Sequence, residues 1–233
     1  MSEDRDSYYR ALEQQVLTYK ELSTITVEEN GSPMVSLAKT FSGRIFVSDE
    51  RMKAFTGEDI YVRAELVPML EKARETLKTI WPDCDLQVVY GYRHLDIQIA
   101  KFEAHKARVL ERFPSLSGDE LYETIHRFSA VPEVAGHPTG GAVDICIVDK
   151  DGERVDTGTA VVEYSDDTYV FSPFISRTAW RNRQILRACM IRAGFAPFDG
   201  EWWHFSYGDR EWAFYYSQPK AFFTQLRFKS VDD

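Results

Sequence analysis

The 233-residue sequence has no apolar run of about 18 residues, the length that a membrane-spanning helix requires. It has three widely spaced cysteines and no Cys-x-x-Cys pair, which indicates reduced thiols. Acidic residues outnumber basic ones by 37 to 28, so no cationic surplus is available for nucleic acid or an anionic membrane. The first residues are polar and predict no signal peptide. We therefore expect a cytoplasmic protein with neither nucleic acid nor membrane as a partner.

Several common catalytic motifs are also missing. The sequence has no His-Glu-x-x-His, no Gly-x-Ser-x-Gly and no Walker loop. Residues 36–39 (SLAK) match the Ser-x-x-Lys of penicillin-binding enzymes, but no Ser-Asp-Asn or Lys-Thr-Gly accompanies them. They also fall in a predicted hairpin and would not open a helix. We interpret this match as a coincidence.

The hydrophobic pattern predicts one mixed domain. Hydrophobic residues make up 44% of the chain and charged residues 28%, as in ordinary globular proteins. Apolar spacing predicts helices and, in shorter runs, strands. The expected helices span 8–22, 64–80, 95–113, 117–128 and 176–193, and the expected core strands span 86–90 and 142–148. We expect an α+β fold, a single domain with a mainly antiparallel sheet flanked by helices.

The N-terminal part is predicted to be an extension of this domain. Asn30-Gly31 separates two short apolar runs, 25–27 and 34–37, and Asn-Gly in that position favours a β-hairpin. Residues 44–47 are a candidate third strand. The expected domain covers residues 1–233, with a helix and hairpin in residues 1–50 and the core of the site in residues 54–206.

Two short stretches carry the candidate chemistry. The first, residues 136–144, reads GHPTGGAVD and places His137 in a Pro/Gly turn and Asp144 in the following core strand. The second, residues 201–204, reads EWWH and supplies Glu201 and His204. Two imidazoles and one carboxylate form a three-ligand set that leaves a fourth position for water, which is typical of a catalytic zinc site. A carboxylate such as Asp144 in an apolar strand is costly unless it is paired or bound to a metal.

The remaining groups have distinct predicted roles. Glu201 is a candidate base that takes a proton from zinc-bound water. It should lie in an irregular turn at Gly200, before the strand, because residues 201 and 204 face opposite ways in a regular strand. Arg93, at the end of the 86–90 strand, is a candidate oxyanion stabiliser, with a surface salt bridge as the alternative. Structural or surface roles are expected for the other histidines, which are His94, His105 and His126.

Taken together, the motifs resemble those of the VanX-type D-alanyl-D-alanine dipeptidases and related zinc D,D-carboxypeptidases. Residues 136–144 are similar to the Ser-x-His-x-x-Gly-x-Ala-x-Asp signature, and residues 201–204 to Glu-x-Trp-His. Weaker similarities follow the same order along the chain. They are residues 54–57 (AFTG) to Asn-Phe-x-Gly, residues 91–93 (GYR) to Asp-Gly-Tyr-Arg-Pro, and residues 156–159 (DTGT) to a Met-Gly segment.

The resemblance implies one zinc ion per chain at one end of the central strands, held by His137, Asp144 and His204. Glu201 would be the catalytic base, and Arg93 would stabilise the intermediate. The implied reaction is hydrolysis of D-Ala-D-Ala or a similar dipeptide through a metal-bound water. The alternatives are a D,D-carboxypeptidase that acts on muropeptide fragments and a non-catalytic zinc-binding interaction domain.

The sequence departs from the family pattern where the substrate would bind. The signature serine is Ala135, and the proline after Arg93 is His94. In place of the family's Phe-Asp, whose carboxylate meets the substrate amine, the chain has residues 161–163 (VVE). The candidates for a replacement acid are Glu163, Asp166 and Asp167. Substrate stereochemistry, substrate length and oligomeric state are left open.

Overall fold

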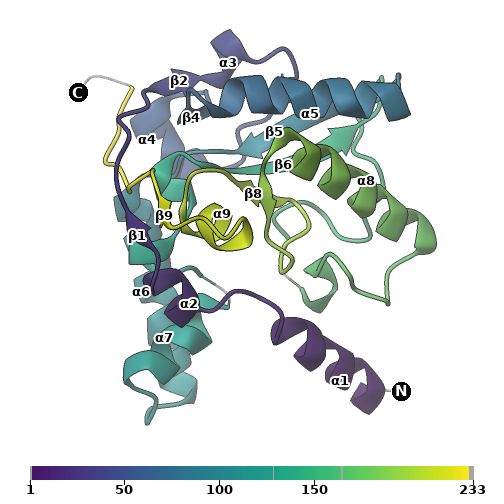
Figure 1. Ribbon diagram of the computed structural model, residues 1–233. Helices are drawn as coiled ribbons and strands as arrows, with labels where there is room; N and C mark the ends of the chain where they lie inside the picture. The colour runs from purple at the N-terminus through teal and green to yellow at the C-terminus, as the bar shows by residue number, and fades with distance from the viewer. Residues whose placement is uncertain (1, 128, 164, 231–233) are drawn as a thin grey trace.

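The structure is a computed structural model that describes residues 2–127, 129–163 and 165–230. Its largest sheet has the strand order β3–β5–β6–β8–β7, and every neighbouring pair is antiparallel except β3 and β5 (Figure 1). The strands are β3 (Arg44–Ile45), β5 (Asp85–Tyr90), β6 (Ala142–Val148), β7 (Ala196–Pro197) and β8 (His204–Ser206). The predicted α+β fold with a mainly antiparallel sheet is confirmed.

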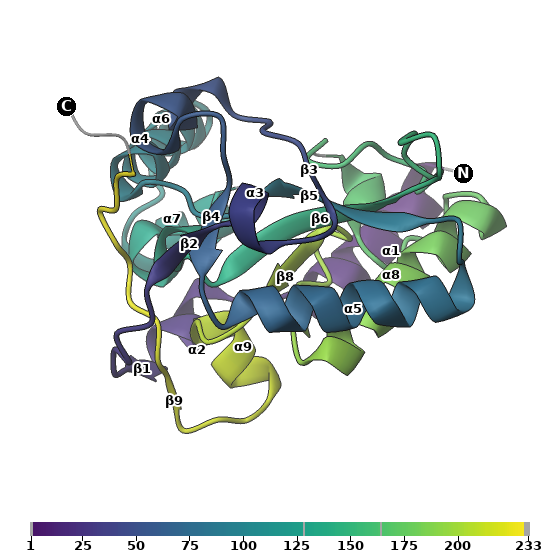
Figure 2. The same ribbon diagram turned by 90° about the horizontal axis from the view of Figure 1, so that it is seen from above.

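Two long helices build the main core with the sheet. Helices α5 (Leu66–Ile80) and α8 (Arg177–Ala193) pack against each other (Figures 1 and 2). The leucines of α5 are buried in one cluster with side chains of β5 and β6. Helix α8 begins and ends as predicted. The Ser176 hydroxyl accepts the Ala179 N–H at 3.0 Å, and Gly194, with a φ of 109°, ends the helix in a left-handed conformation.

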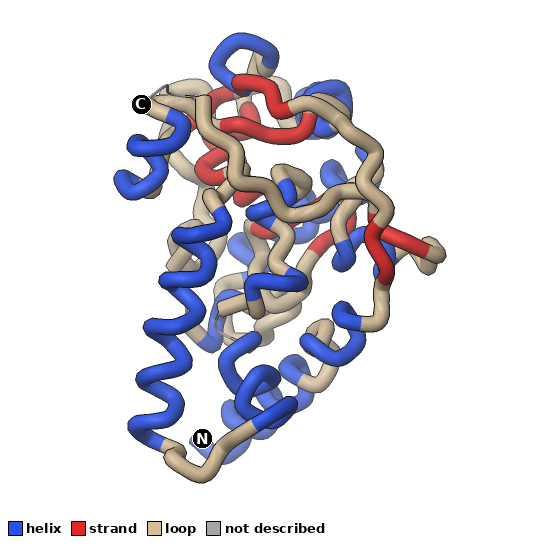
Figure 3. Tube along the Cα trace, turned by 90° about the vertical axis from the view of Figure 1, so that its left-hand side faces the viewer, coloured by secondary structure: helices blue, strands red, loops and turns tan. Residues whose placement is uncertain are grey.

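A second group of elements lies beside the candidate site. Helices α6 (Leu95–Arg112) and α7 (Gly118–His126) form a pair that extends away from the sheet, visible in Figures 1 and 3. Ser117 is at the N-cap of α7, although its side chain makes no capping hydrogen bond there. Residue 128, the expected last residue of this helix, lies outside the described residues. The remaining short elements are α4 (Lys53–Thr56), α9 (Arg210–Tyr215) and the 3-10 turns Glu50–Met52, Pro132–Val134, His137–Thr139 and Asp166–Thr168.

The N-terminal region differs from the prediction. In place of one helix over 8–22, the chain forms α1 (Ser2–Glu13) and α2 (Tyr19–Ser23). The interruption has a local cause, because Thr18 and Glu21 form a reciprocal capping box that starts a new helix. None of the helices in the described ranges combines the length and apolar character that a membrane crossing requires.

The predicted hairpin around Asn30-Gly31 is wrong. Strand β1 (Thr26–Val27) pairs in parallel with β9 (Lys220–Ala221), and β2 (Met34–Ser36) pairs with β4 (Tyr61–Arg63). The side chain of Asn30 accepts the Ser32 N–H at 2.9 Å, which closes a local Asx turn without bringing β1 and β2 together. Residue Ser36 caps the short helix α3 (Leu37–Thr40), so the Ser-x-x-Lys segment does open a helix, contrary to expectation.

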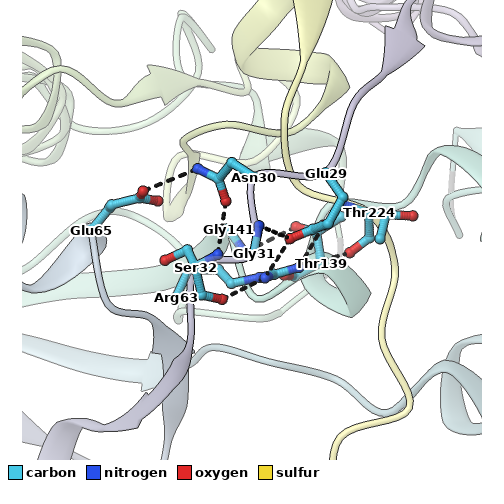
Figure 4. A network of polar contacts seen from close by, with 9 residues as sticks. All are labelled: Glu29, Asn30, Gly31, Ser32, Arg63, Glu65, Thr139, Gly141 and Thr224. Atoms are coloured by element: carbon cyan, nitrogen blue, oxygen red, sulfur yellow. Dashed lines mark hydrogen bonds and ion pairs between the residues drawn. The ribbon is translucent and has the colours of Figure 1, made fainter.

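Figure 4 shows the polar network that replaces the hairpin. The buried Arg63 guanidinium pairs with Glu29 at 2.8 Å and donates to the carbonyls of Ser32 and Thr139. The carboxylate of Glu29 also accepts the Thr224 N–H at 2.7 Å. These contacts attach the N-terminal and C-terminal segments to residues 137–139, the turn that carries His137.

Candidate metal centre and active site

Strand pairing brings Asp144 and His204 together. They are register partners in the antiparallel ladder between β6 and β8, so both side chains project from the same face of the sheet. Nδ1 of His204 lies 3.1 Å from Oδ1 of Asp144, and both residues are buried. The cross-strand pair therefore provides two of the three predicted ligands without any loop rearrangement.

The third predicted ligand enters from the turn before β6. His137 begins a 3-10 turn that ends at Gly140, whose φ of 74° is readily adopted only by glycine. Nε2 of His137 lies 3.4 Å from Oδ1 of Asp144. The ligand atoms of His137, Asp144 and His204 all lie within 4.8 Å of one another. The structure thus brings the predicted set together at one end of the central strands.

The hydrogen-bonding pattern of both imidazoles fits a metal ion. Nδ1 of His137 lies 2.8 Å from the carbonyl oxygen of Gly91, which can only accept, so Nδ1 carries the proton and Nε2 is bare. The outer nitrogen of His204, Nε2, lies 3.3 Å from a carboxylate oxygen of Glu211. Each histidine therefore turns one ring nitrogen to Asp144 and the other to an acceptor. This is the arrangement that orients histidine ligands in zinc sites.

The local electrostatics also suit a cation. Burial lowers the pKa of His137 to about 4, so the imidazole is neutral at physiological pH. Burial opposes the charge of His204, but Glu211 and Asp144 outweigh it and raise its pKa well above the usual value. Burial also opposes the charge of Asp144, yet His137 and His204 lower its pKa overall. The three side chains thus surround a point where positive charge is stabilised.

Glu201 lies in the turn before β8, as predicted. The Glu201 N–H donates to Phe198 O, and the His204 N–H donates to Glu201 O, each at 3.1 Å. Gly200 is required here by space, because a Cβ would lie 2.8 Å from the Phe198 ring. Burial raises the pKa of Glu201 to about 6. A carboxyl group with this pKa beside the ligand set can accept a proton near neutral pH.

Arg93 lies on the wall of the same cavity. The residue is 8% exposed, and its guanidinium donates to Gln98 Oε1 at 2.8 Å and to Tyr90 Oη at 3.2 Å and stacks over the Tyr90 ring. A register shift between Val88 and Tyr90 places Tyr90 opposite Asp144 in the ladder, so the bulge directs this aromatic ring toward the site. Arg93 is therefore buried on the cavity wall, and the alternative of a surface salt bridge is wrong.

The cavity contains further polar residues that sequence reasoning missed. It has a volume of about 60 Å³, and besides the predicted residues its lining includes Gln98, Lys101, His126, Arg127 and Glu211. His126 was expected to have a structural or surface role, and its Nδ1 does accept the Val131 N–H at 3.2 Å while the ring lines the cavity. For Gln98 and Lys101, the available signal was their spacing of three residues, which places both on one face of the helix that follows Arg93.

The acids considered for the substrate amine lie elsewhere. Glu163 and Asp166 are exposed, and a carboxylate oxygen of Glu163 accepts the Ala160 N–H in its own turn. Asp167 bonds Arg5, Tyr9 and Ser172, which join α1 to the loop before α8. None of the three lines the cavity. The carboxylates that do line it are Glu201 and Glu211.

Comparison with known proteins places these residues in a recognised context. The family described as D-ala-D-ala dipeptidase matches residues 88–224, a range that contains the ligand set, Glu201, Arg93 and Glu211. A D-alanyl-D-alanine dipeptidase of Synechocystis sp. is 31% identical over 189 residues, which cover 70% of this chain and 76% of that protein. A D-alanyl-D-alanine dipeptidase of Escherichia coli K12 is 34% identical over 71 residues, or 30% of this chain and 37% of that protein.

Among solved structures, the chain is similar to the LdcB LD-carboxypeptidase. The TM-score is 0.45 and the sequence identity 18%, over 78% of this chain and 70% of the other.

Proposed function

Since the chain belongs to the D-Ala-D-Ala dipeptidase family of metallopeptidases, we propose that it hydrolyses D-Ala-D-Ala or a closely similar dipeptide at a zinc ion. The ion would be held by His137, Asp144 and His204. The observation that supports this most directly is the convergence of these three ligand atoms beside a partly buried carboxyl group with a raised pKa, Glu201. We further propose that residues 1–233 act as a single dipeptidase-like domain, with residues 54–206 as its metal-site core.

In the proposed mechanism, a bound zinc ion would polarise the substrate carbonyl and acidify water. Glu201 takes a proton from the attacking water and delivers it to the nitrogen of the breaking peptide bond. Arg93 is fixed by Tyr90 and Gln98, so its positive charge is already in position when negative charge develops on the carbonyl oxygen. Glu211 faces the outer nitrogen of His204 at 3.3 Å and would orient this ring, and the Gly91 carbonyl orients that of His137.

The decisive experiment is release of free D-alanine from D-Ala-D-Ala by the purified, zinc-loaded protein, with and without a chelator. Release that a chelator stops and added zinc restores would support the proposal. A zinc-loaded protein that cleaves a pentapeptide stem but not the dipeptide would favour the D,D-carboxypeptidase alternative. A protein that binds zinc and cleaves neither would indicate a non-catalytic interaction domain.

The rim of the cavity favours short substrates. The segment between α1 and α2 crosses beside it, because Glu13 pairs with the cavity-lining Arg127 at 2.9 Å and Val16 lies next to Gly200. At the other end of the segment, the Glu123 carboxylate of α7 accepts the backbone N–H groups of Tyr19 and Lys20. The segment is thus attached at both ends, and a peptide longer than two residues would have to pass it.

We predict that Glu13→Ala loosens this barrier. The pair is partly exposed and contributes up to about 1 kcal/mol, so stability and dipeptide cleavage should change little. The ratio of pentapeptide to dipeptide hydrolysis should rise about two- to fivefold, the factor that corresponds to such a pair. Glu103→Ala, which removes a similar pair with Lys106 on the outer part of α6, is the matched control. An equal ratio in the two variants would exclude the barrier.

A further inference from the structure

Lys101 lies on the wall of the cavity, and the predicted chemistry gives it no role. Its position follows from the helix that carries it. Helix α6 places Ile97, Gln98 and Lys101 on one side, since residues three and four apart share a helix face. Ile97 and Gln98 are buried, and Gln98 bonds Arg93. Lys101 therefore extends the wall formed by Arg93 and Gln98 by one helical turn.

The other basic groups of the cavity differ from Lys101 in position or charge. Arg93 is held by Tyr90 and Gln98, and Arg127 pairs with Glu13 at the rim, where its side chain is 54% exposed. Burial lowers the pKa of His126, and its Nδ1 accepts a backbone N–H, so this ring is neutral at physiological pH. Lys101 is less exposed than Arg127, and it differs from Arg93 in lying on α6 and from His126 in carrying an amine.

Lys101 is charged under physiological conditions. Burial and the neighbouring Arg93 lower its pKa to about 8, while Glu201 and Asp144 act in the opposite direction. The amine is thus a cation at pH 7, close enough to Glu201 and Asp144 for their charges to influence it. A partly buried cation at this position is suited to an anionic ligand group.

A dipeptide places such a group close to the reacting bond. Its terminal carboxylate is separated from the scissile nitrogen by a single Cα atom, which puts the carboxylate carbon roughly 3–4 Å from the carbonyl carbon under attack. The group that recognises this carboxylate must therefore lie inside the cavity near Glu201 and Arg93, and not at the rim. Lys101 meets this condition.

We propose that Lys101 binds the C-terminal carboxylate of the dipeptide and thereby selects substrates with a free terminal acid next to the cleaved bond. This assignment rests on the proposed function. It makes Lys101 a specificity-determining residue, distinct from the groups that handle the water and the developing oxyanion. It also explains how a cavity rich in carboxylates accepts a substrate that carries one itself.

The test compares a dipeptide with its C-terminal amide, which has the same shape and no negative charge. Wild-type protein is expected to prefer the acid. Lys101→Met should reduce kcat/KM for the acid about 10- to 100-fold, mainly through KM, as expected for the loss of a charged hydrogen bond. Lys101→Met should cleave the amide at nearly the rate at which the wild-type protein cleaves the amide. Lys101→Arg should restore part of the preference, and Lys106→Met on the same helix is the matched control.

Two results would overturn the assignment. One is a wild-type protein that cleaves acid and amide equally well. The other is an equal loss for both compounds in Lys101→Met, which would indicate that Lys101 only supports the cavity wall. If wild-type protein cleaves neither compound, the proposed function fails, and equilibrium binding of the two to the zinc-loaded protein decides the assignment. Tighter binding of the acid that disappears in Lys101→Met supports it, and equal binding contradicts it.

Discussion

Replacement of Glu201 by glutamine is expected to lower kcat by a factor of about 10²–10⁴ and to leave zinc bound. Glutamine has nearly the same shape, so the turn before β8 and the position of His204 should be kept. Glutamine cannot act as the base. The other carboxylate of the cavity, Glu211, does not replace it because it faces His204. The loss should therefore appear in kcat, while the zinc content measured after dialysis stays at one ion per chain.

The same residue should set the acid limb of the pH profile. Burial raises the pKa of Glu201 to about 6, and only the ionised form can accept a proton. The value of kcat/KM should therefore fall as the pH drops through about 6. Glu163→Gln, which alters an exposed glutamate outside the cavity, should leave both rate and profile unchanged. A Glu201→Gln protein with the wild-type rate would exclude Glu201 as the base.

Stability provides a second measurement on this variant. A carboxyl group whose pKa is raised on folding stabilises the protein while it is protonated and loses that contribution as the pH rises through the folded-state pKa. For a shift from 4.5 to about 6, the ionised Glu201 opposes folding by about 2 kcal/mol at pH 7. Metal-free Glu201→Gln should therefore melt at a higher temperature than the metal-free wild type at pH 7, with the difference vanishing near pH 4.

The proposed ligand set could be predicted from the sequence because its geometry is largely encoded locally. Asp144 lies in a strand that is buried at every position, which a continuous apolar run predicts. Gly140 and Pro138 fix the turn that carries His137. Only the pairing of β6 with β8 is non-local, and the family resemblance supplied it by implying that His204 joins the other two.

Other parts of the site could not be read from the sequence. Glu211 reaches His204 through the position of α9, which depends on contacts with the distant helix α2. The hairpin prediction failed for a similar reason. The Asn30-Gly31 signal is local, but the pairing of β1 and β2 is decided by Arg63 and Thr224, which lie far along the chain. Residues whose roles depend on tertiary contacts leave little pattern in their own neighbourhood.

Replacement of Asp144 by asparagine should remove both the metal and the activity. The amide keeps the size of the side chain but loses the charge that His137 and His204 face at 3.4 and 3.1 Å. Disturbing a group that only orients a ligand typically costs 10- to 100-fold in metal affinity, so loss of a charged ligand should cost at least about 100-fold. Metal content and the zinc-dependent rise in melting temperature both report this loss, because a ligand that binds only the folded state stabilises it.

Three variants together separate the roles within the site. Glu211→Gln should have a zinc affinity between those of Asp144→Asn and Glu201→Gln, because Glu211 would only orient His204. Its zinc affinity should fall about 10- to 100-fold, and its activity should recover at high zinc concentration. Asp144→Asn should not recover under the same conditions, and Glu201→Gln should bind zinc normally without turnover. Circular dichroism would establish that each variant is folded.

Full zinc occupancy in folded Asp144→Asn at low zinc concentration would contradict the ligand assignment, because no other buried carboxylate lies between the two imidazoles within the described part of the chain.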